Sequence, residues 1–302
     1  MLSKSTYETI SGYVPESNIK QNENLAGYTS FKIGGDASCL VDIQSEKQLC
    51  DMAHFLNAVE YPYFVLGNGS NTLVADTGFD GIVLHIGKAY SDIELEGNTI
   101  IAEAGAMLAK VARVAQENGL SGLEFAAGIP GSVGGGVVMN AGAYGGEMSQ
   151  VVSCVRAVSQ DGEVYELSNH DLEFGYRQSV LRNNRFIVSK VVFELTPGDK
   201  DEIRAVMDDY NARRRDKQPL DLPSAGSTFK RPEGYFAGEL IMNAGMRGFQ
   251  IGGARVSDKH CGFVVNVGNA SAEDVLDVIA EVQERVMDRF KVHLEPEIVV
   301  LK

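Results

Sequence analysis

Glycine is concentrated in one stretch of the chain, GIPGSVGGGVVMNAGAYGG over residues 128–146. This stretch holds eight glycines in nineteen residues, whereas the whole chain has 33 in 302. Glycine loses more backbone entropy on folding than other residues and offers no side chain to a core. Close approach of backbone N–H groups to a phosphate offsets such a cost, so a nucleotide or phosphate-bearing cofactor is the first hypothesis. A tight crossover between strands that only needs positive φ remains the structural alternative.

A second loop of similar composition, GNGSN at 67–71, follows a predicted strand over 63–66. It does not complete the dinucleotide fingerprint G-x-G-x-x-G, because Thr72 occupies the last position, and the chain has no Walker loop. G-x-S-x-G and H-E-x-x-H are also absent, which argues against serine hydrolases and zinc proteases. A phosphate cradle in this protein is therefore built differently from the Rossmann and P-loop designs.

The charge balance bears on the class of ligand. The chain has 27 Lys and Arg against 41 Asp and Glu, a formal net charge of −14, so its field repels nucleic acid. An anionic small molecule would need local cations, and these are concentrated at 213–217 and at Lys230 and Arg231. The arginine run also suits a solvated helix end, where cations complement the helix dipole.

Nothing in the sequence predicts a membrane span, a secretory signal or a metal site. No apolar run approaches twenty residues, and the N-terminal segment lacks the apolar core of a signal peptide. The four cysteines lie far apart without metal-ligand spacing, which favours reduced thiols in a cytoplasmic protein.

The periodicity of apolar residues predicts an α+β pattern rather than regular βαβ alternation. A capping box at 45–48 predicts a helix over 46–58, and Asn118-Gly119 ends a second helix that carries Leu108 to Ala115. Strands are predicted at 82–86, 93–95, 99–103, 151–158, 164–167 and 186–195.

The pattern changes after Thr196-Pro-Gly-Asp199, where a domain boundary near residue 197 is predicted. A helix through 203–210 follows, then a strand at 262–267 and a helix capped by Ser271. A terminal strand is predicted over 292–301.

Three further segments resist a purely structural account: FGYRQS at 174–179, SAGSTFK at 224–230 and LEPEI at 294–298. With the two glycine-rich loops and SFKIGG at 30–35, they occur in an order that resembles the UDP-N-acetylenolpyruvoylglucosamine reductases, also called UDP-N-acetylmuramate dehydrogenases. The resemblance runs from about residue 28 to residue 297.

The resemblance implies a fold. Residues 1–27 would form an N-terminal segment, and 28–197 a FAD-binding domain of the p-cresol methylhydroxylase and vanillyl-alcohol oxidase type with two subdomains. Residues 198–302 would form a smaller substrate-binding domain. The short span between Arg177 and Ser227 resembles the compact subtype that lacks an inserted substrate-capping loop.

The resemblance also implies an activity in peptidoglycan precursor synthesis, the NADPH-dependent, FAD-dependent reduction of an enolpyruvyl ether on a UDP-sugar. Hydride addition to the methylene leaves negative charge on the α-carbon and carboxylate, which needs stabilisation and then a proton. Ser227 would donate that proton, Arg177 would orient the carboxylate, and Glu297 would assist as a hydrogen-bonding or proton-delivering partner. The UDP-sugar would be the partner, without nucleic acid or membrane, and the oligomeric state is left open.

The resemblance distributes binding over two further groups of residues. Cofactor binding falls to Gly67, Asn68, Gly69, Ser70, Asn71, Ile129, Pro130, Gly131, Ser132, Gly134, Gly135, Asn140 and Gly142. Substrate or NADPH binding falls to Tyr144, Tyr176, Arg214, Lys217 and Lys230.

One position departs from the family pattern. Family members often carry an arginine two residues after the acidic residue. Here Val299 occupies that position, two residues after Glu297. We expect Arg231 to compensate for the missing cation. Two other hypotheses stay open at this point: a different flavin oxidase on the same fold, and a non-catalytic sensor of nucleotide sugars.

Overall fold

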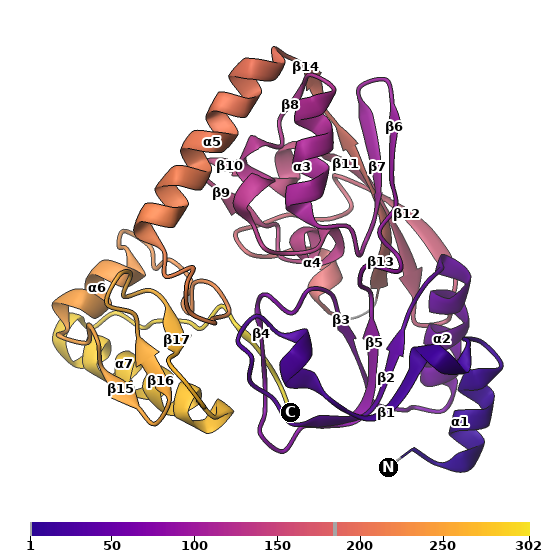
Figure 1. Cartoon of the computed structure of the whole chain (residues 1–302), viewed down its shortest axis with the longest axis horizontal. Coiled ribbons are helices and arrows are strands. Elements are labelled where there is room, and N and C mark those ends of the chain that lie inside the picture. Colours follow the sequence, from indigo (N-terminus) through magenta and orange to yellow (C-terminus); the bar gives the residue numbers. More distant parts are fainter. Residues whose placement is uncertain (1, 184–185) are drawn as a thin grey trace. The chain divides into compact units, whose positions relative to one another are not determined.

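The computed structural model describes residues 2–183 and 186–302, which form two compact units (Figure 1). Each unit combines three stretches of the chain. The first consists of Met1–Asn22, Ser38–Asn68 and Gly81–Arg213, and the second of Glu23–Ala37, Gly69–Asp80 and Arg214–Lys302. The domain boundaries proposed above after residues 27 and 197 remain predictions.

A four-stranded sheet has the strand order β1-β2-β5-β3. Its strands are β1 (Ile19–Asn24), β2 (Asp36–Asp42), β5 (Phe79–His85) and β3 (Tyr63–Leu66). β3 and β5 run parallel, with Leu66 opposite His85. Both strands therefore end at the same edge of the sheet, and the loop at 67–71 begins there.

A five-stranded antiparallel sheet in the first unit has the order β12-β11-β13-β7-β6. Its strands are β12 (Val164–Ser168), β11 (Val152–Ser159), β13 (Phe186–Glu194), β7 (Thr99–Glu103) and β6 (Ile93–Glu96). All five were predicted at these places. Two short pairs complete the unit, β9 (Gly142–Ala143) with β10 (Gly146–Glu147), and β8 (Leu120–Ser121) with β14 (Thr196–Pro197).

The helices of the first unit are α1 (Lys4–Ser11), α2 (Glu46–Ala58), α3 (Leu108–Glu117) and α4 (Val133–Val138). The predicted helix over 46–58 is confirmed as α2. Ser45 caps it by accepting from the N–H of Gln48, but the Gln48 side chain accepts from the Gln44 N–H rather than from Ser45. α4 was not predicted, because glycine-rich sequences rarely form helices.

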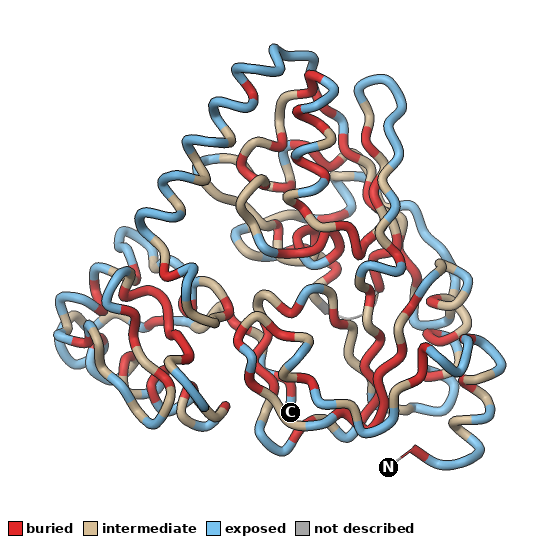
Figure 2. Tube along the Cα trace, in the orientation of Figure 1, coloured by how far each residue is buried: buried red, intermediate tan, exposed pale blue. Residues whose placement is uncertain are grey.

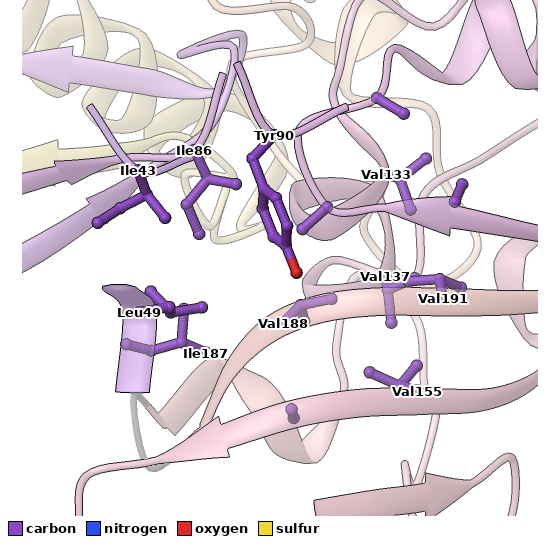
Figure 3. Close-up of a cluster of buried hydrophobic side chains, with 14 of the residues drawn as sticks. Ile43, Leu49, Ile86, Tyr90, Val133, Val137, Val155, Ile187, Val188 and Val191 are labelled. Atoms are coloured by element: carbon purple, nitrogen blue, oxygen red, sulfur yellow. The ribbon is translucent and has the colours of Figure 1, made fainter. Parts of the chain in front are cut away.

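Apolar residues from both sheets and from α2, α3 and α4 form the core of the first unit. The buried stretches are drawn red in Figure 2. Figure 3 shows part of this core, with the ring of Tyr90 among aliphatic side chains that include Ile86, Val137 and Val188.

The long helix α5 (Lys200–Lys217) passes from the first unit into the second. Ile203 is its one buried residue among those described. In the second unit, α6 (Ala237–Asn243) and α7 (Ala272–Phe290) accompany the sheet β15-β16-β17, formed by β15 (Gln250–Ile251), β16 (Ala254–Val256) and β17 (Val264–Asn266).

The N-terminus of α7 is capped twice. Ser271 accepts from the Asp274 N–H, which confirms the predicted cap. The carboxylate of Asp76 also accepts from the N–H groups of Ala272 and Glu273, at 2.8 and 3.0 Å.

The predicted terminal strand over 292–301 is wrong in extent. Only β18 (Val299–Leu301) is a strand, paired in parallel with β4 (Thr72–Val74). Pro296 has no N–H, and the segment before β18 makes one isolated bridge, between Phe229 and Pro296. β17 is likewise shorter than the predicted 262–267.

Among the described residues, no helix is long and apolar enough to cross a membrane. The same part of the chain contains no group of three or more His, Cys, Asp or Glu side chains that could hold a metal ion.

Candidate active site

The two predicted glycine-rich loops meet in the first unit. The side-chain amide of Asn68 donates to the carbonyl oxygen of Pro130 across 2.5 Å. At Gly67 a Cβ atom would lie 2.3 Å from the Ser132 Oγ, so the loop at 128–135 approaches bare backbone of the loop at 67–71. The sequence predicted that these loops act together, and the structure brings Gly67 and Asn68 against residues 130–132.

The loop at 128–135 offers backbone donors to an anion. Gly134 donates to the carbonyl of Ala104, but within residues 2–183 and 186–302 no protein acceptor pairs with the N–H groups of Gly131 and Ser132. Gly135 is exposed, and a Cβ there would meet only the Ser132 Oγ, at 3.6 Å. Unpaired N–H groups beside uncovered glycine backbone fit a phosphate-bearing cofactor.

The rest of the 67–71 loop, residues 69–71, belongs to the second unit. Gly69 has φ +59°, and a Cβ there would lie 2.1 Å from the Tyr28 carbonyl oxygen, so only glycine fits. The Asn71 side chain donates to the Glu297 carbonyl at 3.1 Å, and its own carbonyl accepts from the Val299 N–H. A predicted cofactor residue thus holds the segment that carries Glu297.

Arg177 lies in the first unit, in a tight turn whose ends are Gly175 and Gln178. Each of these two residues donates its N–H to the carbonyl of the other, at 3.0 and 3.2 Å. Arg177 itself has φ +54°, a left-handed conformation that is costly for a side chain of its kind. Its guanidinium donates to the Gly142 carbonyl at 3.1 Å and lies 5.3 Å from the ring of Tyr176, which is 53% exposed.

Gly142 begins the hairpin of β9 and β10, and Tyr144 stands at its tip. Tyr144 has φ +54°, and its ring stacks on that of Tyr210 from α5, with centroids 4.4 Å apart and planes at 14°. Tyr144, Arg177 and Gly142, to which the resemblance gave three different roles, therefore lie in one region. The contact of Tyr210 with Tyr144 was not predicted, because its helical spacing alone marks Tyr210 as part of an apolar stripe.

Ser227 is exposed in the second unit, beside a short backbone ladder. Thr228 donates its N–H to the Gly262 carbonyl at 2.8 Å, and its own carbonyl accepts from the Glu297 N–H at 2.8 Å. The Thr228 Oγ1 accepts from the Val264 N–H. The predicted residues Ser227 and Glu297 thus lie on two paired segments.

The predicted cations differ in their surroundings. Lys230 pairs with Glu295 and is mostly covered, whereas the nearby Arg231 lies over the Phe236 ring, 4.0 Å from its centroid. Arg214 and Lys217 lie in the last turn of α5, with Lys217 exposed.

Comparison with known proteins identifies the family. A FAD-binding domain matches residues 37–168, and the C-terminal domain of UDP-N-acetylenolpyruvoylglucosamine reductase matches residues 218–301. The UDP-N-acetylenolpyruvoylglucosamine reductase of Clostridioides difficile (strain 630) is 44% identical over 301 residues, covering 100% of this chain and 99% of that protein. The chain belongs to this reductase family. The Agathobacter rectalis reductase is 47% identical and covers 98% of each chain.

Solved structures agree with this assignment. The UDP-N-acetylenolpyruvylglucosamine reductase from Thermus caldophilus has a TM-score of 0.81 and 36% identity, over 93% of this chain and 98% of that one. A variant of Phl p 4, a glucose oxidase, has a TM-score of 0.51 and 13% identity over 63% of this chain and 43% of that chain, a likeness of fold alone. The predicted FAD-binding domain of the oxidase type with an appended C-terminal domain is confirmed.

Proposed function

We propose that this protein reduces UDP-N-acetylenolpyruvoylglucosamine to UDP-N-acetylmuramate in peptidoglycan precursor synthesis, with FAD as cofactor and NADPH as reductant. The observation that carries the proposal is its match, over the full length of both chains, to a reductase of that name. The N–H groups of Gly131 and Ser132, which have no acceptor among the described residues, support the cofactor assignment, because they could donate to the pyrophosphate of FAD.

Arg177 holds the carboxylate of the enolpyruvyl group. When bound and reduced, FAD supplies the hydride that adds to the terminal methylene of this group. Negative charge then grows on the carboxylate, and a guanidinium can meet both of its oxygens through two parallel hydrogen bonds. The strained turn of Arg177 supports this role, because such conformations persist where the surrounding structure enforces them for a purpose.

Ser227 delivers the proton that completes the reaction at the α-carbon. A hydroxyl is a weak acid, but the enolate it meets is strongly basic, so the transfer is favourable. Glu297 assists as a hydrogen-bonding partner. The pairing of the Glu297 backbone with that of Thr228 supports this division of labour, because it fixes the spacing of the two segments.

The remaining predicted residues keep their roles as proposals. Residues 28–197 serve the cofactor and 198–302 the substrate, with the compact subtype lacking a capping loop. FAD binds at 67–71, 129–132, 134, 135 and 142. The predicted cofactor residue Asn140 is buried with both ends of its side-chain amide bound to backbone groups, and a different role is proposed for it below. Tyr144, Tyr176, Arg214, Lys217 and Lys230 contact the UDP-sugar or the NADPH phosphates. Arg231 supplies the cation that Val299 does not.

A spectroscopic titration tests the function. The purified protein should show a flavin absorption spectrum that NADPH bleaches under anaerobic conditions. Adding UDP-N-acetylenolpyruvoylglucosamine should restore the oxidised spectrum and yield UDP-N-acetylmuramate in equal amount. Restoration by oxygen but not by this nucleotide sugar would identify a flavin oxidase instead. Binding of the sugar without any bleaching would identify a sensor.

A further inference from the structure

We propose that Asn140 is a positioning residue that fixes the turn carrying Arg177. The proposal rests on the proposed function, in which Arg177 holds the substrate carboxylate. Asn140 is 1% exposed and lies in the first unit, four residues before the tip of the β9-β10 hairpin. The family resemblance placed it among the cofactor residues.

Both ends of the Asn140 side-chain amide bind backbone groups. Its Nδ2 donates to the carbonyl oxygen of Gly175 at 3.0 Å, and its Oδ1 accepts from the Ser149 N–H at 2.9 Å. Gly175 is the first residue of the Arg177 turn, and the carbonyl that Asn140 binds also accepts the cross-turn bond from Gln178. Asn140 therefore joins the turn to the segment that follows β10.

Two neighbouring contacts connect the same two stretches of chain. Ser179 donates its hydroxyl to the Val138 carbonyl at 2.8 Å, and Arg177 donates to the Gly142 carbonyl at 3.1 Å. Along residues 138–142, Asn140 lies midway between these two carbonyls. Asn140 donates to the backbone of Gly175, the first residue of the turn, so it acts on the turn rather than on the arginine side chain.

Backbone conformation explains why the turn needs this support. Arg177 at φ +54° is in a left-handed conformation that residues other than glycine adopt only at a cost, so a turn with fewer fixed partners would relax. Asn140 is itself at φ +42°, which asparagine and aspartate tolerate better than other side chains. Its residue type suits both its backbone position and its two hydrogen bonds.

The main test uses Asn140→Asp, with Asn169→Asp as the matched control. Aspartate preserves shape and still accepts from Ser149, but as a carboxylate it cannot donate to Gly175. Asn169 donates its side-chain amide to the carbonyls of Ser149 and Val152, so its replacement removes donors from the same segment without touching the turn. Asn140→Gly is the second variant, because it removes both bonds and suits the positive φ.

We expect Asn140→Asp and Asn140→Gly to slow reoxidation of the reduced flavin by the nucleotide sugar about 10- to 100-fold, because small misplacements of a positioned group cost that much. The rate of flavin reduction by NADPH should stay within twofold. Without any turnover, hydrogen exchange at the Gly175 and Gln178 amides should become faster than in the Asn169→Asp protein.

A double mutant separates positioning from other roles. In an Arg177→Ala background, Asn140→Asp should slow reoxidation no further, because Asn140 acts through Arg177. A further loss in that background, equal slowing of both half-reactions, or unchanged exchange at the turn would each overturn the proposal. If the unaltered protein is not reoxidised by the sugar at all, the proposed function fails, and the exchange measurement still decides whether Asn140 holds the turn.

Discussion

The backbone N–H of Glu297 donates to the carbonyl oxygen of Thr228 across 2.8 Å. Thr228 also donates to Gly262, so the residue after Ser227 is fixed on both sides by other segments of the second unit. Backbone hydrogen bonds between short segments thus fix the positions of Ser227 and Glu297, which are proposed to act on the same substrate. The exposed Ser227 hydroxyl is held at a rigid base, which suits a preorganised proton donor.

Replacing Ser227 by alanine should therefore affect one half of the reaction. We expect reoxidation of the reduced flavin by the nucleotide sugar to slow about 100-fold or more, since loss of one preorganised group typically costs that much. Reduction by NADPH should be unchanged. Anaerobic stopped-flow absorbance measures both half-reactions separately.

The control is Ser224→Ala, the same chemical change three residues earlier. The Ser30 hydroxyl donates to the Ser224 carbonyl at 2.6 Å, and this backbone contact survives the substitution. Its reoxidation rate should match that of the unaltered protein. Equal losses in the two variants would show that the loop, and not the Ser227 hydroxyl, limits the reaction.

The stack of Tyr144 on Tyr210 predicts a change in substrate affinity. Tyr210→Leu removes the ring that holds Tyr144, and aromatic pairs of this kind contribute about 0.5–1.5 kcal/mol. We expect KM for the UDP-sugar to rise about 2- to 10-fold with kcat preserved, as measured by steady-state kinetics. Tyr165→Leu is the control, because the Tyr165 ring pairs with Phe186 within the five-stranded sheet, away from the Tyr144 hairpin. A rise in KM of equal size there would refute a specific role for the stack.

The sequence predicts those parts of this fold whose signals are local. Ser45 and Ser271 allow the starts of α2 and α7 to be predicted, because an N-cap is encoded within four residues. The glycine-rich loops could be interpreted because many glycines in one stretch indicate either positive φ or close approach of the backbone to a ligand. The sequence predicted only that the two loops bind one ligand. The structure adds a direct hydrogen bond between them, from Asn68 to Pro130.

Contacts between distant residues escaped prediction. Tyr144 and Tyr210 are 66 positions apart, and Asn140 and Gly175 are 35 apart, so no periodicity links them. The terminal strand was overextended because Val292 and Leu294 suit a strand, while Pro296 and the lack of a continuous partner decide otherwise. Local propensity yields to tertiary pairing at such places.

Asp76 should stabilise the second unit through α7. Asp76→Ala removes both carboxylate oxygens that accept at the helix N-terminus. We expect the free energy of unfolding to fall by about 1 kcal/mol, typical of a lost cap. Asp76→Asn keeps one acceptor oxygen and should lose less. Urea unfolding followed by circular dichroism measures the difference. Identical midpoints for the two variants and the unaltered protein would show that Ser271 alone suffices as the cap.

We expect Asp42 to make a pH-dependent contribution to the stability of the first unit. Its carboxylate accepts from the His85 Nδ1 at 2.5 Å and pairs with the Lys20 ammonium at 2.7 Å. The hydrogen bond from His85 lowers the pKa of Asp42, burial opposes this effect, and the bond from Lys20 adds to it. The folded carboxyl group thus has a lower pKa than the unfolded one.

The sign of the pH effect follows from this difference. The unfolded state binds the proton more readily, so the contribution of Asp42 is fully present above the unfolded pKa of about 3.9 and is lost as pH falls through the folded value. Asp42→Asn should therefore lower the midpoint of unfolding clearly at pH 7, with a difference that shrinks below about pH 4. Asp51→Asn, which breaks an ion pair with the exposed Lys47, should change the midpoint little at pH 7. A deficit for Asp42→Asn that stays constant down to pH 3 would show that its cost is steric and not electrostatic.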